Sequence, residues 1–408
     1  MIRLLHTADI HLDAPLKSLA LKDDDLAQRV RAATRMAFTR IVDTALAEGV
    51  AALLISGDLF DGAERSARTA AYLTAQLDRL RAAGIPVFYI KGNHDAENPI
   101  TGEVDLPDNV HVFDGRGGKM RLTPEIWIHG VSFAGRHAPE SLLPKFPTPV
   151  ANCINIAMLH TSLAGAAGHD VYAPCSVAEL KALGFDYWAL GHVHQRHVHS
   201  RDPWIVMPGM PQGRDIGEAG PKTATLITLD DGIAVAEVPI SAVEFLRCQL
   251  DVSDLESDDA LRDRLRRDLH ALADTLQSED GIVRLSLHGA TPRRWQILRD
   301  QDNWSGIAGE LARGTGRLWL EKLVLELADP AGRGQGATDE LAQLMEAVQA
   351  EDTFADTLRS ELEAVLAELP PQRRAALIPD AEAARRLSAE RAEAGAAWIL
   401  ARMKGSAD

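Results

Sequence analysis

Residues 51–61 read AALLISGDLFD, a short apolar run that passes directly into a glycine and two aspartates. An uninterrupted apolar run of this length is typical of a strand that is buried on both faces of a parallel sheet. The polar residues follow its carboxyl end, which is where open α/β sheets bind their ligands. Residues 51–61 therefore predict an α/β fold with a ligand site just beyond the strand.

The same order of strand, polar loop and helix repeats through the first hundred residues. Residues 2–5 and 87–90 are predicted as further strands, and apolar residues recur at helical spacing over 30–41 and 70–80. This alternation predicts a parallel sheet covered by helices. Later in the chain we expect strands at 126–133, 154–159, 187–190 and 205–207, a helix at 177–183, and a hairpin over 224–238 that turns at Asp230-Asp231-Gly232.

The length of 408 residues predicts more than one domain. Residues 1–240 are expected to form the α/β domain. Residues 241–330 alternate between strand and helix patterns and predict a small α+β domain. Residues 331–408 start with a glycine-rich linker at 332–336 and continue as an Ala-, Glu- and Leu-rich stretch, which predicts a pair or trio of helices.

The composition predicts a soluble, folded protein, with 46% hydrophobic and 25% charged residues. No apolar run approaches the length of a membrane span or a secretory signal, so we expect a cytoplasmic protein that does not bind membranes. Cys153, Cys175 and Cys248 form no CxxC pair. They therefore indicate three reduced thiols and neither a disulfide framework nor a zinc knuckle.

Five polar clusters follow predicted strands and contain side chains that can bind metals. Asp, His and Asn supply the oxygen and nitrogen donors that suit Mn²⁺, Fe²⁺ or Zn²⁺. In Asp-x-His and His-x-His, residues two apart on an extended segment point to the same side, so both can reach one metal region. The clusters are Asp9-Ile10-His11, Gly57-Asp58-Leu59-Phe60-Asp61, Gly92-Asn93-His94-Asp95, His160 and Gly191-His192-Val193-His194.

Each of these residues also has an ordinary explanation when it is taken alone. An aspartate after a strand is often a turn former, and a single histidine such as His160 is often a buried structural residue. Seven residues of suitable type, all placed after strands, favour a metal centre instead. Histidines without such a context are interpreted as structural or surface residues: His6, His129, His197 and His199.

In their order along the chain, the five clusters resemble the signature motifs of calcineurin-like metallophosphoesterases. The wider sequence resembles the SbcD/YhaO group of DNA repair exonucleases, through His6-Thr7-Ala8-Asp9-Ile10-His11-Leu12, the loop at 57–61, and Pro208-Gly209 followed by Gln212-Gly213-Arg214. The motif resemblance covers roughly the first 240 residues. It implies a metallophosphoesterase fold, a β-sandwich flanked by helices, followed by a small α+β capping domain and a helical C-terminal region.

The resemblance also implies a site with two divalent ions, for which we expect Mn²⁺. It assigns Asp9, His11, Asp58 and His194 to one ion and Asp58, Asn93, His160 and His192 to the other, with Asp58 as the bridge. Two such ions bind the phosphate and lower the pKa of a water between them. His94 would protonate the departing sugar oxygen or stabilise the phosphate. Asp61 or Asp95 would orient a histidine, unless they only cap loops, and Arg214 would contact phosphate.

The function that the resemblance implies is a DNA repair nuclease, a 3′ to 5′ exonuclease with single-strand endonuclease activity. It further implies an SMC-like ATPase partner of the SbcC or YhaN kind and a homodimer formed by the phosphoesterase domain. Two alternatives remain: a small-nucleotide phosphodiesterase or phosphatase, and a DNA-end-binding scaffold whose catalysis is dispensable. A net charge of −16 is unusual for a DNA-binding protein, unless bound cations supply positive charge at the site.

Overall fold

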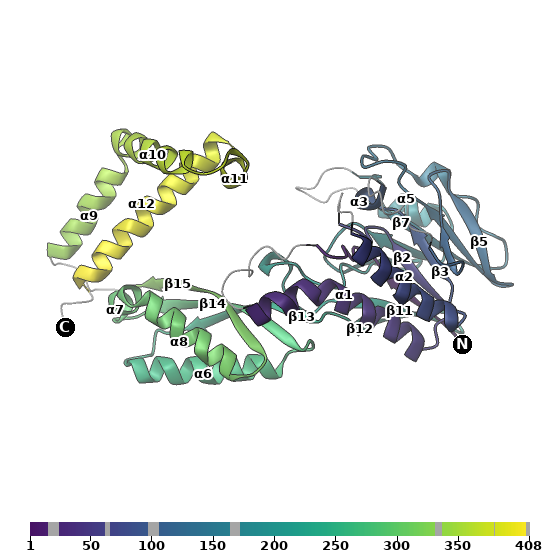
Figure 1. Ribbon diagram of the computed structural model, residues 1–408, viewed down its shortest axis with the longest axis horizontal. Coiled ribbons are helices and arrows are strands. Elements are labelled where there is room, and N and C mark those ends of the chain that lie inside the picture. Colours follow the sequence, from purple (N-terminus) through teal and green to yellow (C-terminus); the bar gives the residue numbers. More distant parts are fainter. Residues whose placement is uncertain are drawn as a thin grey trace. The chain divides into compact units, whose positions relative to one another are not determined.

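The computed structural model describes residues 1–14, 24–61, 66–96, 106–163, 172–330, 337–378 and 380–404 (Figure 1). These residues form two compact units. Unit 1 contains Met1–Arg247, Leu272–Val283 and Arg317–Glu321, and unit 2 contains Cys248–Ala271, Arg284–Gly316 and Lys322–Asp408. The glycine-rich linker expected at 332–336 lies outside the described residues. Among the described helices, none is long and apolar enough to cross a membrane.

Unit 1 contains two mixed six-stranded sheets. The first has the order β12-β11-β1-β2-β3-β4, in which β1 to β4 run parallel and the β11–β12 hairpin pairs antiparallel to β1. Its strands are β1 (Ile2–Thr7), β2 (Ala52–Ser56), β3 (Val87–Ile90), β4 (Val110–Val112), β11 (Thr223–Leu229) and β12 (Ile233–Pro239). The parallel sheet and the hairpin predicted from the sequence are thus confirmed.

The second sheet has the order β5-β6-β7-β8-β10-β9, with parallel pairing from β6 through β10 and an antiparallel strand at each edge. Its strands are β5 (Gly118–Thr123), β6 (Ile126–Val131), β7 (Ile154–His160), β8 (Tyr187–Gly191), β10 (Trp204–Met207) and β9 (His197–Arg201). Strands β4, β5 and β9 were not predicted from the sequence.

The apolar strand β2 is buried on both faces, which explains its uninterrupted pattern. Leu54 packs between the sheets with Ile128 and Ile156 of the second sheet. Leu53 and Ile55 point to the other face, because successive side chains of a strand alternate. Helices α1 (Asp24–Ala47) and α2 (Ala67–Ala82) cover that face, and α5 (Val177–Ala182) packs against the outer face of the second sheet. The predicted β-sandwich flanked by helices is therefore confirmed.

Unit 1 also takes in short stretches from beyond residue 240. Asp280 accepts a hydrogen bond from Arg29 at 3.1 Å, and the hydroxyls of Ser241 and Ser278 lie 2.7 Å apart. Phe245 and Ile282 are buried in a cluster with α1. The first compact unit thus does not end where the α/β pattern of the sequence ends, and the three-domain division at 240 and 330 stays a prediction.

The remaining elements comprise a third sheet and the C-terminal helices. Strands β13 (Val243–Asp251), β14 (Asp280–Ala290) and β15 (Leu318–Ala328) pair in the order β13-β14-β15, and α6 (Asp258–Asp274), α7 (Arg294–Arg299) and α8 (Gln301–Gly314) lie between them in sequence. The prediction of two or three C-terminal helices was wrong. The described residues after 336 form four helices, because Pro370-Pro371 starts a separate short helix: α9 (Ala337–Gln349), α10 (Asp352–Ala367), α11 (Pro371–Leu377) and α12 (Ala381–Lys404).

Candidate metal centre

The five predicted loops converge at one place in unit 1. Their side chains form three overlapping groups, and within each group the metal-binding atoms lie within 4.8 Å of one another. His11 and Asp58 each belong to two groups, so the three groups make one continuous cluster. The groups are Asp9, His11 and His194; His11, Asp58 and His94; and Asp58, His160 and His192.

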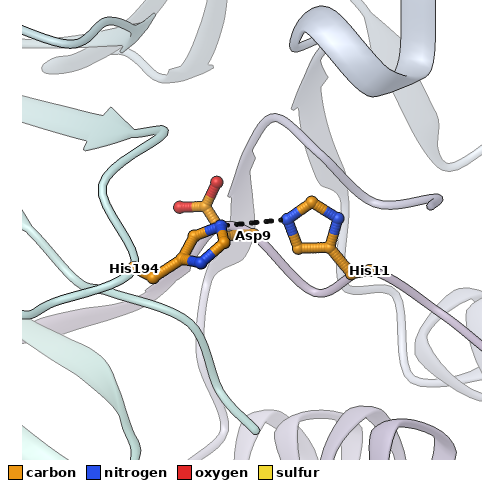
Figure 2. Close-up of side chains that lie close together, drawn as sticks. All are labelled: Asp9, His11 and His194. Atoms are coloured by element: carbon orange, nitrogen blue, oxygen red, sulfur yellow. Dashed lines mark hydrogen bonds between the residues drawn. The ribbon is translucent and has the colours of Figure 1, made fainter. Parts of the chain in front are cut away.

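The first position lies between the loops that follow β1 and β8. The Nε2 atoms of His11 and His194 are 3.2 Å apart, and Figure 2 shows these two rings beside the carboxylate of Asp9. The same carboxylate accepts the backbone N–H of His192 at 3.0 and 3.1 Å. Asp58 Oδ2 lies 3.9 Å from His11 Nε2. The structure therefore places Asp9, His11, His194 and Asp58 together.

The second position lies on the other side of Asp58. His160 Nε2 is 3.4 Å from Asp58 Oδ2, 3.1 Å from Asn93 Oδ1 and 3.3 Å from His192 Nδ1. The two oxygens accept hydrogen bonds and donate none, so a proton or a cation has to lie between them and the imidazole. Asp58 borders both positions, as expected of a bridging ligand.

The outward-facing nitrogens of two histidines are held by oxygen atoms. His160 Nδ1 lies 2.9 Å from the carbonyl oxygen of Ser56, which can only accept a hydrogen bond. His194 Nδ1 is 2.8 Å from the carboxylate of Glu218. Each contact places a proton on Nδ1 and leaves the lone pair of Nε2 directed into the cluster. His11 Nδ1 lies 3.4 Å from Asp61 without a hydrogen bond. The arrangement of His160 and His194 is typical of metal-binding histidines, so the side chains present fit two divalent ions.

The backbone is strained at four of the seven positions that carry the proposed ligands. Asp9, His11, Asp58 and His192 have φ angles of +52°, +45°, +50° and +103°. A residue other than glycine in this region costs about 1–3 kcal/mol, and such residues concentrate at functional sites. The first two loops hold each other in this shape, since the N–H groups of Asp9 and His11 donate to the carbonyl oxygens of Gly57 and Asp58, each at 3.0 Å.

Two glycines make room for the cluster. A Cβ atom at Gly92 would overlap the carboxylate of Asp58 and the ring of His160. A Cβ atom at Gly57, where φ is +95°, would overlap the same ring. Glycine at these positions lets the backbone approach the ligands closely.

The cluster attracts positive charge. Burial alone would raise the pKa of Asp58, but His160, His11 and His94 hold that pKa well below its usual range. Burial would lower the pKa of His160, yet Asp58 and Asp9 raise it to about 9. Because metal ions compete with protons for such ligands, this charge distribution also favours a divalent cation.

Comparisons with known proteins agree with this geometry. A family model described as calcineurin-like phosphoesterase matches residues 2–196, and one described as the middle domain of metallophosphoesterase YhaO matches residues 245–328. The chain is 34% identical over 241 residues to the uncharacterized metallophosphoesterase YhaO of Bacillus subtilis, which is 57% of this chain and 58% of that protein. Residues 2–196 thus match the calcineurin-like phosphoesterases, and the chain is similar to metallophosphoesterases of the SbcD/YhaO type.

Two further relatives of this chain are named DNA double-strand break repair protein Mre11. That of Methanosarcina mazei is 25% identical over 258 residues, 60% of this chain and 39% of the relative. That of Methanopyrus kandleri is 26% identical over 338 residues, 74% of this chain and 71% of the relative. The matched segments thus span 58% of YhaO and 39% of the first Mre11 protein.

The structure places His94 at the edge of the cluster. Its backbone N–H donates to Asp58 Oδ1 at 3.0 Å, and its ring meets that of His11 edge to face. Burial lowers the pKa of His94, although Asp58 and Asp61 oppose the shift. The side chain is 35% exposed and lines a cavity of about 620 Å³ with Asp58 and Asn93. His94 can therefore meet a ligand that enters the cavity.

Asp61 and Asp95 have different surroundings. Asp61 lies near His11 and is 3.9 Å from His94 Nδ1, which fits the predicted role of orienting a histidine. Asp95 is fully buried and accepts the backbone N–H groups of Phe60 and Gly92, both at 3.0 Å. Burial and the charge of Asp58 raise the pKa of Asp95 to about 6. These contacts show Asp95 holding the loops in place, which agrees with the loop-capping alternative, and its contact with a histidine stays a prediction.

Sequence reasoning missed Glu218 and Lys222, which also line the cavity. Glu218 contacts both His194 and Arg214, so the guanidinium of Arg214 has a carboxylate partner. The phosphate contact expected of Arg214 stays a prediction. The spacing of Arg214 and Glu218 was the available signal, because a basic and an acidic residue four apart can pair where the chain turns. Nothing in the local pattern of Lys222 marks it as part of a site.

Proposed function

We propose that this metallophosphoesterase is a two-metal DNA nuclease, a 3′ to 5′ exonuclease with single-strand endonuclease activity that acts in DNA repair. The observation that carries the proposal is Asp58, which borders two adjacent groups of metal-binding side chains. Two neighbouring ions suit phosphodiester cleavage because they stabilise the attacking and the leaving oxygen together. The names of the Mre11 relatives support DNA as the substrate.

The roles of the side chains follow from their positions. The bound ions, Mn²⁺ in our proposal, supply the Lewis acidity that activates water and holds the phosphate. Asp9, His11, Asp58 and His194 hold one ion, and Asp58, Asn93, His160 and His192 hold the other. His94 donates a proton to the departing sugar oxygen from the edge of the cavity. Lys222, in the cavity wall, attracts a neighbouring phosphate of the DNA strand.

The proposed partners are DNA, a second copy of the chain and an SMC-like ATPase of the SbcC or YhaN kind, all in the cytoplasm. The C-terminal helices α9, α10 and α12 expose large apolar side chains, which support docking of a coiled-coil segment. The exposed residues are Leu344, Val348, Val365, Trp398, Ile399 and Met403.

The experiment is Mn²⁺-dependent degradation of end-labelled duplex and single-stranded DNA by the purified full chain. Asp58→Ala and His94→Ala should abolish or strongly reduce cleavage. His197→Ala removes an exposed histidine on β9 and should cleave as the wild type does. Of the two variants that lose cleavage, only His94→Ala should still bind two Mn²⁺ ions, because His94 is not a proposed ligand.

Two outcomes would replace the proposal with one of its alternatives. Turnover of a small phosphodiester without DNA cleavage, even with an added ATPase partner, would indicate a small-nucleotide phosphodiesterase. The cavity of about 620 Å³ is large enough for such a ligand. Tight DNA binding without turnover of either substrate would indicate a DNA-end-binding scaffold.

A further inference from the structure

The carboxylate of Glu218 makes a short contact with one of the proposed metal ligands. Its Oε1 atom lies 2.8 Å from His194 Nδ1, and the side chain is only 17% exposed. Glu218 belongs to the 3-10 helix η2 (Ile216–Glu218), whereas His194 follows β8. The contact therefore joins two segments that are separated in the sequence.

The electrostatics of this contact determine which nitrogen of His194 carries the proton. The guanidinium of Arg214 also lies near Nδ1, with Nη2 at 3.2 Å. If Nδ1 accepted from Arg214, its lone pair would face the carboxylate of Glu218 at 2.8 Å, which is unfavourable. Nδ1 therefore donates to Glu218, and the lone pair of Nε2 points toward His11 Nε2, 3.2 Å away.

Arg214 fixes the carboxylate of Glu218 in turn. The backbone N–H of Arg214 donates to Oε2 at 2.7 Å, and its Nη2 donates to Oε1 at 3.1 Å. The backbone N–H of Glu218 donates to Asp215 at 3.0 Å, which closes the turn. Glu218 is therefore held by both backbone and side-chain contacts, and its carboxylate is a rigid acceptor for the imidazole.

We propose that Glu218 is a positioning residue that sets the affinity of one metal position, the one formed by Asp9, His11 and His194. The inference rests on the proposed two-metal function. The other position has supports of its own, since Ser56 holds His160 and the backbone N–H of His94 holds Asp58. Loss of Glu218 should therefore weaken one position and spare the other.

The test measures binding of Mn²⁺ alone to the full chain, by equilibrium dialysis and by the electron paramagnetic resonance signal of the bound ion. Glu218→Ala should lower the affinity of one of two positions by roughly 10- to 100-fold, as removal of a partner of a metal-binding histidine commonly does. Glu218→Gln keeps an oxygen for His194 but loses the charge, so the Mn²⁺ affinity of that position should lie between those of the wild type and Glu218→Ala. Glu48→Gln breaks a surface ion pair with Arg3 and should bind as the wild type does.

A double mutant separates positioning from a general loss of structure. If Glu218 acts only through His194, then Glu218→Ala should cause no further loss of Mn²⁺ affinity in a His194→Ala background. If Glu218→Ala bound Mn²⁺ at both positions with unchanged affinity, or lost affinity equally at both, the inference would be overturned and the two-metal proposal would stand. A wild-type chain that binds fewer than two Mn²⁺ ions would instead contradict the proposed function.

Discussion

His6 allows a test of how the fold holds the metal centre together. It lies in β1, shortly before Asp9, and its Nε2–H donates to the carbonyl oxygen of Leu190 at 3.0 Å. Its Nδ1 accepts from the hydroxyl of Tyr187, also at 3.0 Å. Both partners lie in β8 of the opposite sheet, the strand that leads to His192. Neutral His6 therefore ties the two sheets together beneath the site.

The expected effect of pH on stability follows from this burial. Burial lowers the pKa of His6 from 6.5 to about 3, with the charge of Arg196 adding to the shift and Leu190 opposing it. Since the pKa is lower in the folded state, protons bind more tightly to the unfolded chain. Stability is therefore unaffected by His6 above pH 6.5 and falls as the pH drops from 6.5 toward 3. Each unit by which the pH falls in this window lowers the free energy of unfolding by about 1.4 kcal/mol. At a pH of about 5, protonation of His6 in the unfolded chain should therefore have lowered it by about 2 kcal/mol.

The assay is urea-induced unfolding near pH 7 and near pH 5 of the wild type, His6→Gln and His197→Gln. Glutamine keeps a donor for Leu190 and an acceptor for Tyr187 but does not titrate. Because other titrating groups are common to all three proteins, His6→Gln should lose about 2 kcal/mol less on acidification than the other two. An equal loss in all three proteins would refute the role assigned to His6.

Three further predictions concern the site. Gly92→Ala should lower Mn²⁺ affinity and DNA cleavage at least about tenfold, because the new methyl group meets Asp58 and His160; Gly306→Ala in α8 meets nothing within 4 Å and should have no such effect. Lys222→Gln should raise KM for DNA and reduce the salt dependence of binding by about 0.7–0.9 in log–log slope, while turnover of a small phosphodiester stays unchanged. Mn²⁺ at 100 times its Kd should raise the free energy of unfolding by about 2.7 kcal/mol per site in a urea titration, and Asp58→Ala should remove most of this gain.

The sequence predicted the ligand loops because their signal is local. Each of the five clusters directly follows a strand, and parallel strands bring their carboxyl ends to the same edge of a sheet. Buried strands such as β2 and β7 are marked by uninterrupted apolar runs. The order of strand and ligand in the sequence was therefore enough to predict that Asp9, Asp58 and His160 lie in one site.

What the sequence did not predict depends on contacts between distant segments. Strands β5 and β9 lie at sheet edges and carry exposed polar residues, so they lack an apolar pattern. The contact of Glu218 with His194 depends on the path of the chain after β10. Similarly, Ser278 and Asp280 join unit 1 only through tertiary contacts, so a chain cut at residue 240 would lose part of the packing of that unit.

The site also accounts for how a chain with a net charge of −16 would act on DNA. Asp9 and Asp58 are the only carboxylates among the proposed ligands, because Asn93 and the histidines bind metals as neutral groups. Two divalent ions would outweigh the two ligand carboxylates, so metal binding would add positive charge within an acidic chain, and Lys222 lies in the wall of the same cavity. In the proposed nuclease, attraction for the DNA backbone is thus concentrated where the strand is cut, and it depends on the same ions that carry out the chemistry.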